Sequence, residues 1–221
     1  MTETRRSYDE GCIAAHALDL VGDRWALLIA RELFLGPRRF SAIRAGLPGI
    51  SANILTQRLL AMEGQGLLTR EPLPPPAETI AVYALTDAGR ALWPVVAALA
   101  RWGAGQPGHD PRRFISPAAL MLSMAAEWRA APLSLTAGFL IDGEAFSVTL
   151  DTGRYRVVRG AGAADLSFAG SANRLARVVY GPQTFVQSLA EGGLAFTGDA
   201  GLAQRFLDGF DLARPEPDLP F

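Results

Sequence analysis

Two short helices joined by a tight turn are predicted by the stretch RRFSAIRAGLPGISANILTQRLLAMEGQGLLTR, residues 38–70. The first helix begins at Phe40 and ends at the glycine and proline residues of 46–49, because glycine frees the backbone and proline cannot continue a helix. Ser51 then stands where the second helix needs an N-cap. This layout is a helix-turn-helix.

The second helix, expected over 52–63, has one apolar and one polar face. Leu55, Leu59 and Met62 fall at i, i+4 and i+7, the spacing of a buried stripe. Amide side chains pair with adenine edges and arginine with guanine edges in the major groove of DNA. One hypothesis is therefore that this face contacts DNA bases; the alternative is a polar face that is only solvated. The residues expected to contact bases are Ser51, Asn53, Thr56, Gln57 and Arg58.

Positive charge gathers on the same segment, although the whole chain has a net charge of −1. Residues 24–70 hold seven arginines and two acidic residues, whereas residues 103–221 hold ten arginines and twelve acidic residues. A phosphate-binding surface requires such a local excess. The residues expected to contact phosphates are Arg38, Arg39, Arg44 and Arg70.

Composition places the chain among ordinary globular proteins, with 49% hydrophobic and 19% charged residues over a length of 221. Its apolar stretches are far shorter than the ~20 residues that a membrane span needs. The N-terminus has no apolar region typical of a secretory signal, and Cys12 is the only cysteine. We therefore expect no membrane insertion, no intrachain disulfide and a cytoplasmic location.

A β-hairpin is predicted directly after the helix-turn-helix, which makes a winged helix. The last helix before the linker is strongly apolar, and Pro94 is placed to kink it. Such a helix belongs either to a core or to a dimer seam. The elements expected in this half are helices at 13–21, 24–35, 40–45, 52–63 and 88–102, and strands at 67–73 and 79–85.

At this point the chain resembles the HxlR-type regulators, relatives of the MarR group, over residues 12–102. The matching segments are CIAAHALDLVGDRW (12–25), GPRRFSAIRAGLPGIS (36–51), LTQRLLAMEGQGLLTR (55–70) and VYALTDAGRAL (82–92). The resemblance implies a DNA-binding transcription regulator that acts as a homodimer on a palindromic operator. It assigns 51–63 to the major groove and 67–85 to the wing. Two-fold binding to a palindromic operator needs a dimer seam that places the recognition helices about 34 Å apart.

The chain departs from this family in two places. The wing tip is rich in proline and alanine and carries Glu71 and Glu78, so we expect it to bind phosphate less than usual. Ile13 follows Cys12 where family members often have proline. Some members sense oxidants through that cysteine, so Cys12 is either a redox-active thiol or a small buried hydrophobe.

A glycine- and proline-rich segment, GAGQPGHDP at 103–111, is the best domain boundary. It predicts a winged-helix domain at 1–102 and a second domain at 112–221. A sheet of half-buried antiparallel strands covered by helices on one face makes this second domain α+β. Its expected elements are helices at 117–130, 172–180, 183–191 and 200–210, and strands at 134–141, 144–150, 154–159, around 166–168 and at 194–197.

The second domain resembles sterol-carrier-protein-like domains over residues 116–210. The matching segments are ADLSFAGSANRLARVVYGPQTF (164–185) and LAEGGLAFTGDAGLAQRFLDGF (189–210). The resemblance implies a hydrophobic cavity between sheet and helices for an apolar or lipid-like effector; the alternative is a packed core. The residues expected to line the cavity are Met121, Met124, Trp128, Phe139, Phe146, Phe168, Phe185 and Phe196.

No catalytic set emerges from the sequence. His16 and His109 form no spaced metal set with Cys12, and the GAGAAD segment at 160–165 precedes a strand instead of a helix. We therefore expect no enzyme, metal or cofactor. The leading hypothesis is a dimeric regulator, a repressor, with an effector-sensing second domain. A protein-interaction module whose second domain only stabilises the dimer is the alternative. A third hypothesis, an enzyme acting on a lipid-like substrate, rests only on the resemblance of the second domain and has no catalytic set behind it.

Overall fold

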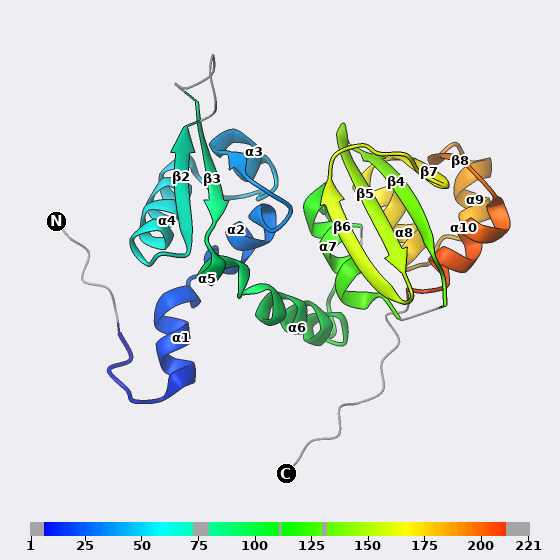
Figure 1. The fold of residues 1–221 in the computed structure, drawn as a ribbon. Helices are drawn as coiled ribbons and strands as arrows, with labels where there is room; N and C mark the ends of the chain where they lie inside the picture. The colour runs from blue at the N-terminus through cyan, green and yellow to red at the C-terminus, as the bar shows by residue number, and fades with distance from the viewer. Residues whose placement is uncertain (1–6, 73–79, 111, 130–131, 211–221) are drawn as a thin grey trace, which may run out of the picture. The chain divides into compact units, whose positions relative to one another are not determined.

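The computed structural model describes residues 7–72, 80–110, 112–129 and 132–210. Contacts divide the chain into two compact units, Met1–Val96 and Ala97–Phe221, and each is considered by itself (Figure 1). The predicted domains at 1–102 and 112–221, with a linker at 103–111, stay a prediction.

The N-terminal unit is a winged helix. Its three strands pair antiparallel in the order β1-β3-β2. The elements are α1 (Ile13–Val21), α2 (Ala26–Leu33), β1 (Arg38–Arg39), α3 (Phe40–Ala45), α4 (Ala52–Gly64), β2 (Leu68–Pro72), β3 (Ala81–Leu85) and α5 (Asp87–Arg90).

Both helices of the predicted helix-turn-helix are confirmed as α3 and α4. The Ser51 hydroxyl accepts a hydrogen bond from the Ile54 amide at 3.2 Å, which confirms the N-cap. The predicted hairpin is confirmed by β2 and β3, whereas its tip at 73–79, with Glu78, lies outside the described residues. Leu55, Leu59 and Met62 are buried in the unit's core, so the opposite face of α4 is turned outward.

The helix expected at 88–102 is two helices, α5 and α6 (Trp93–Ala104). Pro94 explains the break, because it has no N–H for the carbonyl one turn earlier and disfavours helical geometry in the residue before it. The division between the two units lies inside α6.

The C-terminal unit is a five-stranded sheet in the order β6-β5-β4-β7-β8, with α7, α8 and α10 on one face (Figure 1). This confirms the predicted α+β class. Its elements are α7 (Pro117–Glu127), β4 (Leu135–Ile141), β5 (Glu144–Asp151), β6 (Arg154–Arg159), β7 (Leu166–Gly170), α8 (Ala172–Val179), α9 (Phe185–Ala190), β8 (Leu194–Thr197) and α10 (Ala200–Leu207).

One strand pair departs from the expected antiparallel pattern. Asp142 and Gly143 both have positive φ angles, 48° and 82°, so the predicted tight turn does join β4 to β5. However, β7 pairs with β4 in parallel, because the chain crosses from β6 at one edge to the far side of β4. Within this five-stranded sheet, β4, β5 and β6 form a meander.

Candidate nucleic-acid interface

The outward face of α4 carries the side chains that the sequence predicts to contact bases. Asn53, Thr56 and Gln57 are all exposed. The Thr56 hydroxyl donates a hydrogen bond to the Ala52 carbonyl at 2.9 Å, so it is already engaged within the helix. Ser51 is exposed as well, but its hydroxyl serves the N-cap.

Two large apolar side chains lie exposed on the same helix, and sequence reasoning did not single them out. Ile54 is 39% exposed and Leu60 is 61% exposed. Their position outside the i, i+4, i+7 stripe of buried residues is the signal that would have found them. The helix therefore offers methyl groups beside its amides.

Arg58 is placed differently from its neighbours on α4. Its Nε lies 3.1 Å from a carboxylate oxygen of Asp23, and each side chain is 33% exposed. Asp23 precedes α2, so the ion pair holds this guanidinium against the unit. Arg58 is therefore less available for contact with DNA than the exposed Gln57 is.

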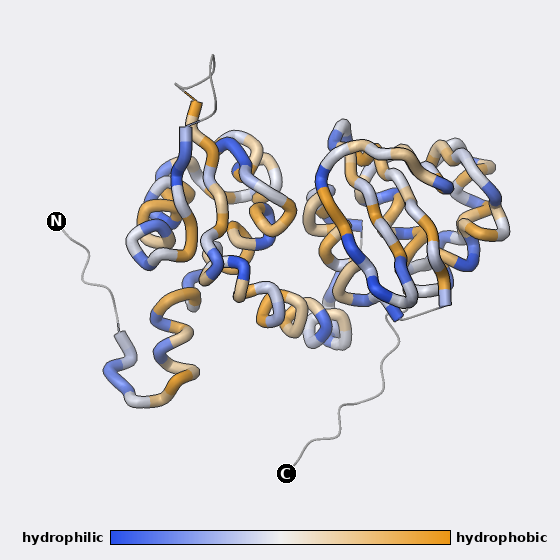
Figure 2. Tube along the Cα trace, viewed as in Figure 1, coloured by the Kyte–Doolittle hydropathy of each residue, from blue (hydrophilic) through white to orange (hydrophobic). Residues whose placement is uncertain are grey.

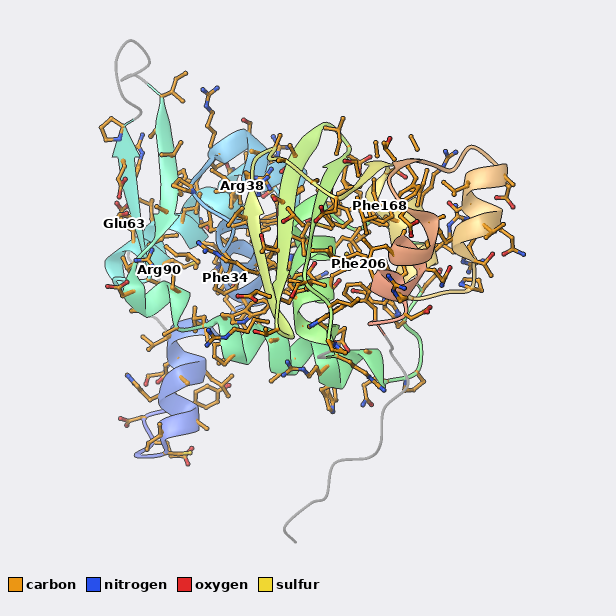
Figure 3. All side chains as sticks on the ribbon, turned by 45° about the vertical axis from the view of Figure 1, so that its right-hand side comes forward. Phe34, Arg38, Glu63, Arg90, Phe168 and Phe206 are labelled. Carbon is orange, nitrogen blue, oxygen red and sulfur yellow. The ribbon has the colours of Figure 1, made fainter. Side chains whose placement is uncertain are left out.

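The predicted phosphate contacts divide into exposed and buried arginines. Arg39, Arg44 and Arg70 are exposed. Arg38 is only 9% exposed, and its Nη1 donates to the fully buried Glu32 at 2.8 Å (Figure 3). β1 turns Arg38 inward and Arg39 outward, because side chains alternate along a strand. The structure thus corrects the expectation for Arg38, which is a structural residue.

Cys12 is exposed at the N-cap of α1, so its interpretation as a small buried hydrophobe is wrong. Backbone hydrogen bonds from Ala15 and Ala14 lower the pKa of the Cys12 thiol below its usual value. Its redox role stays a prediction. Among the residues that the structure describes, no cluster of three or more His, Cys, Asp or Glu is arranged to hold a metal ion.

The space between sheet and helices in the C-terminal unit is filled by the side chains expected to line a cavity there. Met121, Met124, Phe146 and Phe168 are at most 1% exposed, so their side chains are packed against neighbouring residues. The ring centroids of Phe139 and Phe168 lie 5.2 Å apart. The ring centroids of Phe168 and Phe206, two residues labelled in Figure 3, lie 6.1 Å apart in the same layer. The predicted packed core is the better description of this layer.

A hollow of about 350 Å³ lies instead against the face of the sheet opposite the helices. Mostly small side chains on outward-facing strand positions make its floor, and the β6–β7 connection borders it at Ala161 and Gly162. Of the eight residues predicted to line a cavity, four border this hollow from strand positions that face the helices: Phe139, Phe146, Phe168 and Phe196. The hollow is not lined by the other four, Met121, Met124, Trp128 and Phe185. Its floor includes Gly138, Leu140, Ala145, Ser167, Ala169 and Ala195.

Comparison with known proteins identifies the N-terminal part. Residues 20–110 match the HxlR-like helix-turn-helix family. The HTH-type transcriptional regulator YvaP of Bacillus subtilis is 38% identical over 86 residues, which cover 39% of this chain and 79% of YvaP. The chain belongs to the HxlR-like family. YybR of Bacillus subtilis, also an HTH-type transcriptional regulator, is 33% identical over 108 residues, which cover 47% of this HxlR-like chain and 83% of YybR.

The remainder of this HxlR-like chain matches a second family, since residues 119–211 fit the SCP-2 sterol transfer family. Among solved structures, the reduced form of the regulator YodB from Bacillus subtilis is 34% identical and covers 45% of this chain and all of YodB, with a TM-score of 0.39. Because its HxlR-like relatives are transcription regulators, the chain is a DNA-binding transcription regulator of the HxlR type and not an enzyme. Within the described residues no helix is long and apolar enough to cross a membrane.

Proposed function

We propose that two copies of this regulator bind a palindromic operator in double-stranded DNA, each with α4 in the major groove. The observation that carries this proposal is the outward face of α4, where exposed Asn53, Thr56 and Gln57 lie opposite the buried stripe. Exposed Arg39 and Arg44 belong to the same unit and supply charge for phosphates.

The proposed dimer uses α6. Val95, Leu99 and Trp102 are 45%, 48% and 67% exposed, and they follow one another at i, i+4 and i+7. That spacing belongs to a helix face that packs against a partner, and the hydrophobic residues of α6 are visible in Figure 2. We propose that α6 of a second copy covers this stripe, because a palindromic operator requires a two-fold partner.

We propose that DNA binding represses transcription, because a protein bound to a promoter can block transcription by its presence alone. We also propose that the C-terminal unit senses an apolar small molecule. Because its interior is filled, the hollow on the open face of the sheet is the proposed effector site. An effector there acts only if it favours one dimer arrangement over another.

A gel-shift titration of the full chain on duplexes from the region upstream of its own gene, across a salt series, tests DNA binding. The logarithm of the affinity is expected to fall with the logarithm of salt concentration, by about 0.9 for each phosphate contact. Arg44→Ala should reduce that slope by about one contact, whereas Arg205→Ala, an exposed arginine of α10, should not. A response that is flat in salt would instead favour the protein-interaction module.

A further inference from the structure

We infer that α4 reads A·T base pairs and that thymine methyl groups are part of the surface it recognises. The inference rests on the proposed function and adds the base composition of the operator half-site. Its basis is the difference between the side chains of α4 that bond to other parts of the protein and those that are exposed and able to contact DNA.

The structure disfavours recognition of guanine by α4. The commonest guanine-specific contact is a bidentate arginine or lysine, and Arg58 is the only cation in α4. Its guanidinium is ion-paired with Asp23 at 3.1 Å and two-thirds buried. Using it in the groove would break that pair and leave the equally buried Asp23 carboxylate with the Trp25 amide, which donates to it at 3.0 Å, but without the arginine. Recognition of guanine by this helix is therefore opposed by its own fold.

Adenine reading remains available. Asn53 and Gln57 are exposed and four residues apart, so their side chains lie on the same face of the helix, one turn from each other. Each carries the paired donor and acceptor that match the N6 and N7 atoms of adenine.

The apolar groups complete the match. Because the Thr56 hydroxyl donates to the Ala52 carbonyl, its methyl group is what the exposed side chain offers a ligand. Leu60, at 61% exposure, lies on the Asn53–Gln57 face, and Ile54 lies at its flank. The thymine methyl is the apolar group that base edges present in the major groove. Amides beside methyl groups therefore complement the two halves of an A·T pair.

The test begins with selection of duplexes from a randomised library by the full-length protein, and A·T pairs are expected to be enriched in each half-site. The selected duplex is then made with uracil in place of thymine, which removes only the methyl groups. The affinity of the protein for the duplex should fall about fourfold for each methyl group that it contacts, because burying one such group changes a binding constant by about that factor. This arm uses wild-type protein, so it does not depend on how any variant folds.

Matched variants assign the effect to residues. Thr56→Ser keeps the hydroxyl that bonds Ala52 and removes the methyl, and Leu60→Ala shortens the exposed side chain. Both should reduce the difference in affinity between thymine and uracil duplexes, whereas Arg58→Gln should leave the selected sequence unchanged. Enrichment of G·C pairs, or equal affinity for thymine and uracil duplexes in a protein that still selects a sequence, would overturn this inference alone. Failure to select any sequence would contradict the proposed function and, with it, the inference.

Discussion

At the scale of single residues, Arg38 and Arg39 show how far adjacent arginines can differ. Arg38 donates to Glu32, which is fully buried and also accepts from Arg31 at 2.9 Å, while Arg39 is exposed. The Arg31 guanidinium in turn donates to the Gly46 carbonyl at 3.3 Å, which connects α2 to the end of α3. The buried carboxylate thus holds the helix-turn-helix in place.

Glu32→Ala is expected to lower the free energy of unfolding by about 3–5 kcal/mol, because it leaves the buried Arg38 guanidinium without this carboxylate. Urea denaturation measures the change. Arg39→Ala is the matched control and should stay within about 0.5 kcal/mol of the wild type. The double variant Glu32→Leu/Arg38→Met should recover part of the loss, since the buried Arg38 charge is then removed together with its partner. A Glu32→Ala protein as stable as the wild type would refute the structural role of this pair.

Residue roles set by neighbours in sequence could be predicted, and those set by tertiary contacts could not. The Ser51 N-cap depends only on the next turn and is confirmed. The inward turn of Arg38 depends on β3, with which β1 pairs, and a strand of two residues has no periodic pattern to reveal it. The Arg58–Asp23 pair likewise joins segments far apart in the chain.

At the scale of elements, strongly periodic segments were predicted well, because an amphipathic stripe is a local signal. α1, α3 and α4 begin where the sequence places them. The parallel pairing of β7 was missed, since alternation shows that a strand is half-buried but not which strand lies beside it. The apolar pattern of α6 was evident from the sequence, but only the structure shows that Trp102 on this helix is exposed and not part of a core.

Trp102→Glu should convert the proposed dimer into a monomer, because a charge on the exposed α6 stripe would be desolvated at the seam. Sedimentation equilibrium measures the mass, and operator affinity should fall with it. Val186→Glu is the control, since Val186 is 71% exposed on α9, away from the stripe, and should leave the mass unchanged. A Trp102→Glu protein that stays dimeric would exclude α6 as the seam.

At the scale of the whole molecule, each unit has its own buried core, which indicates separate unfolding. We expect two transitions in scanning calorimetry. Leu59→Ala should destabilise the N-terminal transition, by about 2–5 kcal/mol for a buried leucine, and leave the other in place. Phe206→Leu, in the core of the C-terminal unit, should do the reverse. A single transition shifted by both variants would contradict independent units.

The site of the proposed effector also belongs to this scale, because the core of the C-terminal unit is packed and a hollow lies on the opposite face of its sheet. An apolar fluorescent probe, anilinonaphthalene sulfonate, should bind the native protein at the hollow and lose that binding in Ala169→Phe, which fills the floor. Met124→Leu, which keeps the volume of a fully buried side chain, should bind the probe as the wild type does.

Thermodynamic linkage between probe binding and operator binding then tests whether the hollow regulates DNA binding. If the probe changes operator affinity, operator DNA must change probe affinity by the same factor, and both effects should vanish in Ala169→Phe. Probe binding that is equal with and without operator would mean that the hollow has no differential affinity for the two dimer arrangements. In that case the C-terminal unit would only stabilise the proposed dimer, as a domain whose core contains the packed rings of Phe139, Phe168 and Phe206.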